Sequence, residues 1–126
     1  MTLEGVFHIL NHMVQYQSTL DRTFLALSDP TRRTILDRLV EGSATISELA
    51  EPTGMSLTGL KKHVAVLEEA RLVKTEKRGR ARHCHLDQKG FDEAAFWLEE
   101  FRRGWADRFD RLDEIIERKK LEGKKK

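Results

Sequence analysis

The sequence predicts a mainly α-helical chain with one small β-hairpin, and two segments carry that prediction. Residues 45–73 contain two short amphipathic helices joined at a glycine, followed by the start of a strand. Residues 74–86 complete a second strand after the basic tip Arg78-Gly79-Arg80. Two helices followed by a basic hairpin are typical of a winged helix-turn-helix, whose second helix enters the DNA major groove. A long C-terminal helix completes the predicted architecture.

Composition excludes several classes of protein. With 126 residues, 35% of them charged, the chain suits one soluble helical domain that is small enough to favour dimerisation. No apolar run approaches the roughly 18–20 residues of a membrane span, and the N-terminus lacks the features of a signal peptide. The single cysteine, Cys84, excludes an intramolecular disulfide. We expect a cytoplasmic protein without a membrane partner.

Charge is distributed unevenly along the chain. Residues 58–86 carry eight Lys and Arg against three acids, whereas residues 1–57 carry four against seven. Residues 87–118 carry six basic and ten acidic residues, and the last eight residues carry five Lys and one Glu. Charge blocks of this kind are often only solvated faces, but a positive centre between negative helices also predicts a phosphate-binding surface.

The chain divides into four predicted segments. They are an N-terminal amphipathic segment (1–18), a winged helix-turn-helix DNA-binding domain (19–89), a C-terminal dimerisation helix (90–119) and a basic tail (120–126). Apolar residues from Val6 to Val14 recur at helical spacing in the first segment. Met13 is a second candidate start, and its use would make the first twelve residues dispensable.

The domain begins with two predicted helices. A short helix over residues 20–27 is expected to turn Phe24 and Leu27 inward. In the next, Asp29 caps the N-terminus, Pro30 occupies a position where no N–H is needed, and Gly42 ends the helix. Its predicted buried face consists of Ile35, Leu36, Leu39 and Val40.

Local signals also define the two helices of the motif. Thr45 and Glu48 form a capping box for the first helix. Pro52 and Gly54 mark the turn, and Ser56 caps the second helix. The first helix is predicted to bury Ile46, Leu49 and Ala50, and the second Leu57, Leu60, Val64 and Leu67.

The face of the second helix left outside predicts contacts with double-stranded DNA. Lysine reaches guanine or phosphate, and hydroxyl groups serve either. Arginines on a glycine-containing wing tip suit a narrow minor groove, although an ordinary solvated hairpin is the alternative. For His63 the alternative is a packed helix residue. For Arg32 and Arg33 contact with the DNA backbone and simple pairing with acidic side chains are both open. The predicted DNA-binding residues are Ser56, Thr58, Gly59, Lys61, Lys62, His63, Arg78, Arg80 and Arg82.

The C-terminal helix carries six of the nine aromatic residues. A helix of about 30 residues is about 45 Å long, more than so small a domain needs. Its apolar residues recur near the spacing of a helix–helix seam, so we expect it to pair with a second copy. Packing within one chain is the alternative. The predicted dimer interface consists of Phe24, Leu98, Phe101, Trp105, Phe109, Leu112 and Ile116.

From about residue 20 to 116 the chain resembles the ArsR-type winged helix-turn-helix repressors. The matching segments are LSDPTRRTILDRL, ISELAEPTGMSLTGLKKHVAVLEEARLV, KRGRARHCHLD and FWLEEFRRGWADRFDRLDEII. The resemblance implies a homodimeric repressor or activator bound to an imperfect palindrome, often in its own promoter. Lys61 departs from the small polar residue common at its position in the family, which adds phosphate-seeking charge.

The resemblance is to a branch without the usual metal-sensing residues. Metal sensors of the family carry paired cysteines on the first helix of the motif, or an Asp/His set on the C-terminal helix. Here residues 46–50 contain no thiol and the C-terminal helix contains no histidine. Because soft and borderline metals favour such ligands, we expect no metal and no cofactor at these two sites.

Three alternatives to a DNA-binding regulator remain. An enzyme is disfavoured, since no phosphate-cradling glycine loop, nucleophile elbow or paired-carboxylate signature is present. An effector-responsive sensor would use His83, Cys84 and His85, but strand alternation places Cys84 on the opposite face from both histidines. A winged-helix protein-interaction module is disfavoured by the basic wing.

Overall fold

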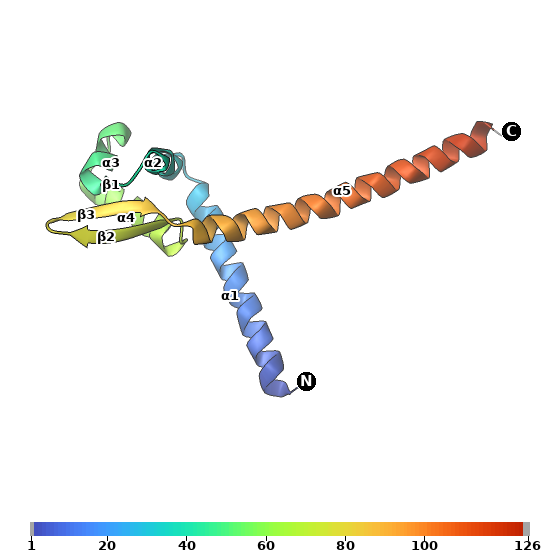
Figure 1. Ribbon diagram of the computed structural model, residues 1–126, viewed down its shortest axis with the longest axis horizontal. Coiled ribbons are helices and arrows are strands. Elements are labelled where there is room, and N and C mark those ends of the chain that lie inside the picture. Colours follow the sequence, from blue (N-terminus) through green and yellow to red (C-terminus); the bar gives the residue numbers. More distant parts are fainter. Residues whose placement is uncertain (1, 125–126) are drawn as a thin grey trace. The chain divides into compact units, whose positions relative to one another are not determined.

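The computed structural model describes residues 2–124 and is mainly helical (Figure 1). The chain folds as two units, Met1–Ala94 and Ala95–Lys126. The first contains four helices, a small sheet and the beginning of the last helix. The second is the remainder of that helix. The predicted fold class, a winged helix-turn-helix followed by a long C-terminal helix, is confirmed.

Helix α1 (Leu3–Leu27) is continuous, where the sequence predicted two helices. Residues 15–19 continue the helix without a break, and the Thr19 hydroxyl donates to the carbonyl of Gln15 four residues earlier. The expectation that Phe24 faces inward is wrong, since its side chain is 37% exposed. Thr23 is buried instead: its hydroxyl donates to the carbonyl of Thr19 at 3.0 Å and approaches that of Ala70 at 3.4 Å.

Helix α2 (Pro30–Val40) begins as predicted. The Asp29 carboxylate accepts a hydrogen bond from the Arg32 N–H at 3.0 Å, and Pro30 occupies the first turn. Ile35, Leu36 and Leu39 are buried. Val40, expected on the same face, is 74% exposed because it is the last residue of the helix and lies beyond the packed surface.

Helices α3 (Ile46–Thr53) and α4 (Leu57–Glu69) form the helix-turn-helix. Gly54 ends α3 in the left-handed region at φ 65°, as its predicted place in the turn requires. Pro52 lies inside α3 and does not mark the turn. The Thr45 hydroxyl accepts from the Glu48 N–H, as in the predicted capping box, but the Glu48 carboxylate contacts that hydroxyl and not the Thr45 N–H.

The packed side of α4 meets the other helices. Leu60, Val64 and Leu67 are buried in one core cluster with residues of α2, α3 and the sheet, as predicted. Leu57, the fourth residue expected there, is 49% exposed. Its place in the first turn directs it toward the surface groove described below.

The sheet has three antiparallel strands in the order β1-β3-β2, where the sequence predicted a two-stranded wing. Strands β2 (Val73–Arg78) and β3 (Ala81–Leu86) form the hairpin, which turns at Gly79 with φ 62°. Strand β1 (Ala44–Thr45) pairs with β3 through the Ala44–Cys84 register. A strand of two residues exists only because it pairs with a distant strand, so no local sequence pattern predicts it.

Helix α5 (Gln88–Lys124) starts earlier and ends later than predicted. Its start packs closely on the end of α4: Gly90 is buried, and its N–H donates to the carbonyl of Arg71 at 2.8 Å. A Cβ at Gly90 would press into the backbone carbonyls of Ala70 and Arg71, which explains the glycine. Part of the predicted basic tail is helical, and residues 125–126 lie outside the described residues.

Candidate nucleic-acid interface

The outer face of α4 presents polar side chains opposite its buried side. Ser56 caps the helix as predicted, its Oγ accepting from the Gly59 N–H at 3.2 Å. Ser56, Thr58, Lys61 and Lys62 are exposed. The first two turns of α4 therefore offer two ammonium groups and two hydroxyl groups to a partner.

Strand alternation decides which wing residues face α4. In the β2–β3 register Lys77 pairs with Arg82, and Thr75 pairs with the fully buried Cys84. Residues two apart on a strand share a face, so Lys77 and Arg82 lie on the face of the wing that packs on the core. Arg78 belongs to the next register pair and faces the other way, where its guanidinium meets the Glu76 carboxylate at 3.2 Å.

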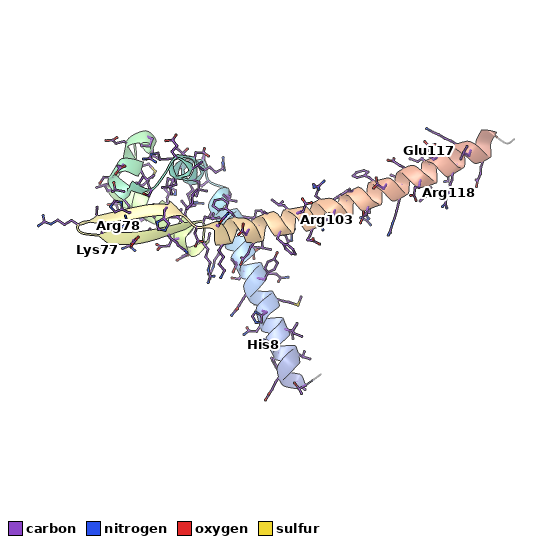
Figure 2. All side chains as sticks on the ribbon, in the orientation of Figure 1. His8, Lys77, Arg78, Arg103, Glu117 and Arg118 are labelled. Atoms are coloured by element: carbon purple, nitrogen blue, oxygen red, sulfur yellow. The ribbon has the colours of Figure 1, made fainter. Side chains whose placement is uncertain are left out.

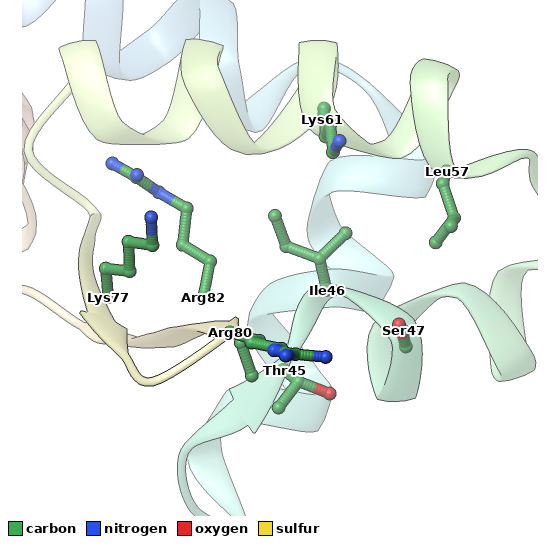
Figure 3. A pocket seen from close by; sticks show the side chains of 9 residues that line it. Thr45, Ile46, Ser47, Leu57, Lys61, Lys77, Arg80 and Arg82 are labelled. Atoms are coloured by element: carbon green, nitrogen blue, oxygen red, sulfur yellow. The ribbon is translucent and has the colours of Figure 1, made fainter.

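A basic groove lies between the wing and the helix-turn-helix (Figure 3). It has a volume of about 430 Å³, and four of its lining side chains are cations while none is acidic. Lys61 reaches it from α4, and Lys77, Arg80 and Arg82 reach it from the wing. The complete lining is Thr45, Ile46, Ser47, Leu57, Lys61, Lys77, Arg80, Ala81 and Arg82.

The structure thus brings together three of the predicted DNA-binding residues, Lys61, Arg80 and Arg82, and leaves Arg78 outside the groove. It adds Lys77, which the sequence analysis missed. Thr75 pairs with the buried Cys84, and Lys77 lies two residues further along the strand, so strand alternation places Lys77 on the same face. The structure also adds Thr45 and Ser47 from the start of α3. Only the fold brings those two next to the wing.

Arg82 is held by a short chain of hydrogen bonds. Its Nε donates to the Thr75 hydroxyl at 3.0 Å, and that hydroxyl donates to the Glu68 carboxylate at 2.9 Å. Glu68 lies in the last turn of α4. The chain therefore ties the wing to the recognition helix and fixes the direction of one groove cation.

His63 lies at a junction of helices. Its Nδ1 is 3.2 Å from an Arg32 nitrogen and 3.9 Å from the Asp29 carboxylate. Arg32 also donates to the carbonyls of Leu25 and Ala26, so it satisfies the C-terminal end of α1. The hydrogen bond from the Arg32 N–H, with the nearby Arg32 and His63 charges, lowers the pKa of Asp29 despite partial desolvation.

Arg33 has a similar structural role. Its guanidinium donates to the carbonyl of Leu27 at 2.8 Å, so it also caps the end of α1. Arg32 and Arg33, for which the sequence allowed contacts with phosphate or acids, thus both bind main-chain carbonyl groups.

Cys84 and its flanking histidines do not converge. Cys84 is fully buried, whereas His83 and His85 point to the other face of β3 and are half-buried. Burial, followed by the nearby Glu68 charge, raises the pKa of the Cys84 thiol, and the positive charge of Arg82 opposes this only in part. A thiol in this state is a poor nucleophile.

Elsewhere the structure shows one close pair of histidines. His8 and His12, on successive turns of α1, place their Nε2 atoms 3.1 Å apart. Within residues 2–124, no group of three or more His, Cys, Asp or Glu side chains is arranged to hold a metal ion. Over the same residues, no helix is long and apolar enough to cross a bilayer.

The second unit presents an aromatic stripe along α5. Trp97, Phe101, Trp105 and Phe109 contact one another in sequence, with ring centroids 5.4, 6.1 and 5.4 Å apart. Leu98, Leu112 and Ile116 add to the large apolar side chains exposed on the helix. Charged residues such as Arg103 and Glu117 also project from α5, as Figure 2 shows.

Comparison with known proteins shows which family the chain is similar to. Residues 27–76 match a family described as a helix-turn-helix domain. The HTH-type transcriptional regulator Rv2034 of Mycobacterium tuberculosis is 38% identical over 90 residues, covering 68% of this chain and 83% of Rv2034. A similar fold is seen in the crystal structure of RHA00566, an ArsR family transcriptional regulator, with a TM-score of 0.68. The two sequences are 41% identical, and the match covers 71% of this chain and 93% of RHA00566. The chain belongs to the ArsR family.

Two further relatives of this ArsR-family protein are informative. The transcriptional repressor SdpR of Bacillus subtilis is 29% identical over 82 residues, covering 65% of this chain and 91% of SdpR. The homodimeric winged helix-turn-helix domain of Mb0332 from Mycobacterium bovis is 26% identical with a TM-score of 0.58, covering 75% of this chain and 84% of that one. The family resemblance predicted from the sequence is confirmed, and the protein is a DNA-binding transcriptional regulator.

Proposed function

We propose that this regulator is a homodimeric repressor that binds a palindromic operator in the cytoplasm and carries out no catalytic step. The observation that carries the proposal is the basic groove, because four cations without an acid between them match a DNA backbone. The name of SdpR, a repressor, supports the negative sign of regulation. Repression follows if the bound dimer blocks access of polymerase to the promoter.

Recognition is divided between α4 and the wing. Ser56, Thr58, Lys61 and Lys62 on the exposed face of α4 read base edges or adjacent phosphates in the major groove. Gly59 stays a predicted DNA contact, and a Cβ there would lie 3.0 Å from the Met55 side chain and 3.4 Å from the Ser56 hydroxyl. Lys77, Arg80 and Arg82, which line the basic groove of the protein, bind the phosphates of the DNA backbone. His63 and Arg78 stay predicted DNA contacts, though both have protein partners here.

Dimerisation is assigned to the aromatic stripe of α5. With 37 residues, α5 is about 55 Å long at 1.5 Å per residue. Trp105, Phe109 and Leu112 are each about half exposed, an unusual amount of adjacent apolar surface for an unpaired helix. The homodimeric state named for Mb0332 supports pairing of this surface with a second copy. Phe24, exposed on α1, stays a predicted member of the same interface.

The proposal is tested by fluorescence anisotropy with the DNA just upstream of the gene and a shuffled duplex as control. At about 0.15 M salt, nonspecific binding typically has a dissociation constant of 10⁻⁴–10⁻⁶ M. Nanomolar binding to the upstream fragment alone would establish an autoregulating DNA-binding protein. Transcription in vitro from that promoter then distinguishes repression from activation. Equal weak binding to both duplexes would contradict binding at that operator.

The dimer is tested separately by sedimentation equilibrium. Trp105→Ala removes a large apolar side chain from the centre of the stripe and should weaken self-association. Asp107→Ala is the matched control, because two residues along a helix correspond to about 200° of rotation. If both variants associate as tightly as the parent, the stripe is not the interface.

A further inference from the structure

A polar crevice in the first unit has no role in the proposed contacts with DNA. It lies where α1, the turn between α4 and β2, and the first residues of α5 meet, and its volume is about 690 Å³. Its lining includes Arg22 of α1, Arg71 of the turn, and Lys89 and Glu93 of α5. The lining differs from that of the basic groove in mixing several cations with one carboxylate.

Three of the lining side chains are cations, Arg22, Arg71 and Lys89. All three are exposed, and among residues 2–124 none of them forms a side-chain ion pair or side-chain hydrogen bond. They come from three different elements, so only the tertiary structure gathers them. Three unpaired cations around one crevice favour an anionic ligand.

The carboxylate of Glu93 supplies a second and independent observation. Its Oε2 is buried and, in the part of the chain that the structure describes, has no hydrogen-bond partner. A buried oxygen that accepts no hydrogen bond is costly, and native proteins generally supply a partner. Because Glu93 also lines the crevice, a ligand there that carries a hydrogen-bond donor would supply the partner once the carboxylate turns toward it.

We propose that the crevice binds a small phosphate, either free or as a monoester, that keeps a P–OH group. The three cations neutralise its anionic oxygens, and the P–OH donates to the Glu93 carboxylate, which turns toward the crevice to accept it. The volume far exceeds that of a bare phosphate ion, which leaves room for the organic part of a monoester. Sulfate and phosphodiesters, including the DNA backbone, lack this proton and leave Glu93 unpaired.

The crevice is placed to influence α4 and the wing. Arg71 follows the end of α4 and has a left-handed backbone at φ 58°, unfavourable for a residue with a side chain. Its carbonyl accepts from the Gly90 N–H, and the next carbonyl, of Leu72, accepts from the Asp87 N–H at 2.9 Å. A ligand bridging Arg71 and Lys89 thus acts on the joint between α4, the wing and α5.

This coupling rests on the proposed function, whereas binding of phosphate does not. A ligand that prefers one arrangement of the joint must change the affinity for DNA by the same factor as DNA changes the affinity for the ligand. The two parts are therefore tested in separate measurements.

The binding part is tested by calorimetric titration of the DNA-free protein with inorganic phosphate, methyl phosphate and sulfate at equal ionic strength. Phosphate should bind saturably, and sulfate at least about tenfold more weakly, because it leaves a buried acceptor unpaired. If methyl phosphate binds as tightly as inorganic phosphate, the crevice is a site for phosphate monoesters. If methyl phosphate does not bind, the crevice is a site for the free phosphate ion. Equal affinities for phosphate and sulfate would overturn the proposal.

Variants locate the site. Glu93→Gln replaces the carboxylate by an amide. Because the amide N–H can donate to sulfate as well as to phosphate, the preference for phosphate should disappear. Arg71→Asn removes a cation while tolerating the left-handed backbone, so the fold is retained and phosphate binding should weaken. Lys74→Ala removes an exposed cation outside the crevice and should change nothing. Unchanged preference in Glu93→Gln, or equal effects of Arg71→Asn and Lys74→Ala, would refute the site.

The coupling part is tested by operator affinity with saturating phosphate against sulfate at matched ionic strength. A shift that disappears in Glu93→Gln supports coupling, and identical affinities in the two salts refute it. If the protein binds no operator at all, the proposed function fails while the titrations still decide whether the crevice binds phosphate.

Discussion

Replacing Lys77 by alanine gives the sharpest test of the basic groove. Lys77 lines the groove on the wing face that also carries Arg82, whereas Lys74 lies three residues earlier on the same strand and faces the opposite side. Lys77→Ala and Lys74→Ala therefore make the same chemical change on two faces of β2. Both side chains are exposed, so neither substitution opens a cavity in the core.

The expected magnitude follows from counterion release. Each phosphate neutralised by the protein contributes about 0.9 to the slope of log K against log salt concentration. In a homodimer, Lys77→Ala removes two contacts, so the slope should fall by about 1.8. Extrapolated from 1 M salt, where the two proteins would bind equally, this corresponds to about 30-fold weaker binding at 0.15 M.

The assay is anisotropy of an operator duplex at several salt concentrations between about 0.05 and 0.3 M. Lys74→Ala should retain the slope of the parent protein. If Lys77→Ala leaves the slope unchanged, or if both variants reduce it equally, the groove is not where the backbone binds. Circular dichroism of each variant verifies that the fold is intact.

Three further predictions concern stability and the thiol. Gly90→Ala should lower the free energy of unfolding by about 1–3 kcal/mol, because its Cβ would press on backbone carbonyls. Gly104→Ala, which meets nothing within 4 Å, should cause no loss in the same urea titrations. The lowered pKa of Asp29 means that its carboxylate stabilises the fold above about pH 4 and that this contribution is lost as the pH falls through the folded-state pKa. Asp29→Asn keeps the cap, so its urea midpoint should decline less steeply from pH 5 to 3, and an identical decline would contradict this assignment. Cys84, buried and with a raised thiol pKa, should react with an aromatic disulfide reagent much more slowly in the native protein than in urea, and equal rates would show that the thiol is accessible.

The elements most reliably predicted from the sequence are those defined by neighbouring residues. The caps at Asp29 and Ser56 and the turn at Gly54 depend on groups within about four residues of one another. The buried face of α4 followed from helical periodicity in the same way. Leu57 was misplaced because a residue in the first turn extends beyond the surface that the rest of the helix packs against.

The candidate site divides along the same line. Lys61 was correctly placed on the free face of α4, and Arg80 and Arg82 on the wing, from local pattern alone. That Lys77 enters the groove while Arg78 does not depends on which face of the hairpin packs against the core. Lys77 and Arg78 are adjacent and each carries one positive charge, so residue type does not show which of them enters the groove.

By itself the sequence determined the helices, the basic hairpin, the family and the charge that makes DNA the partner, because these depend on local spacing and on residue type. Only the tertiary structure decided that Ala44 pairs with Cys84, that Arg32 caps α1, and that Arg22, Arg71 and Lys89 surround one crevice. The strand pairing and the crevice join residues far apart in the chain, and Arg32 reaches back six residues from α2 to the end of α1. Such contacts form only when the packing of the whole core brings distant segments together, so no short stretch of sequence encodes them.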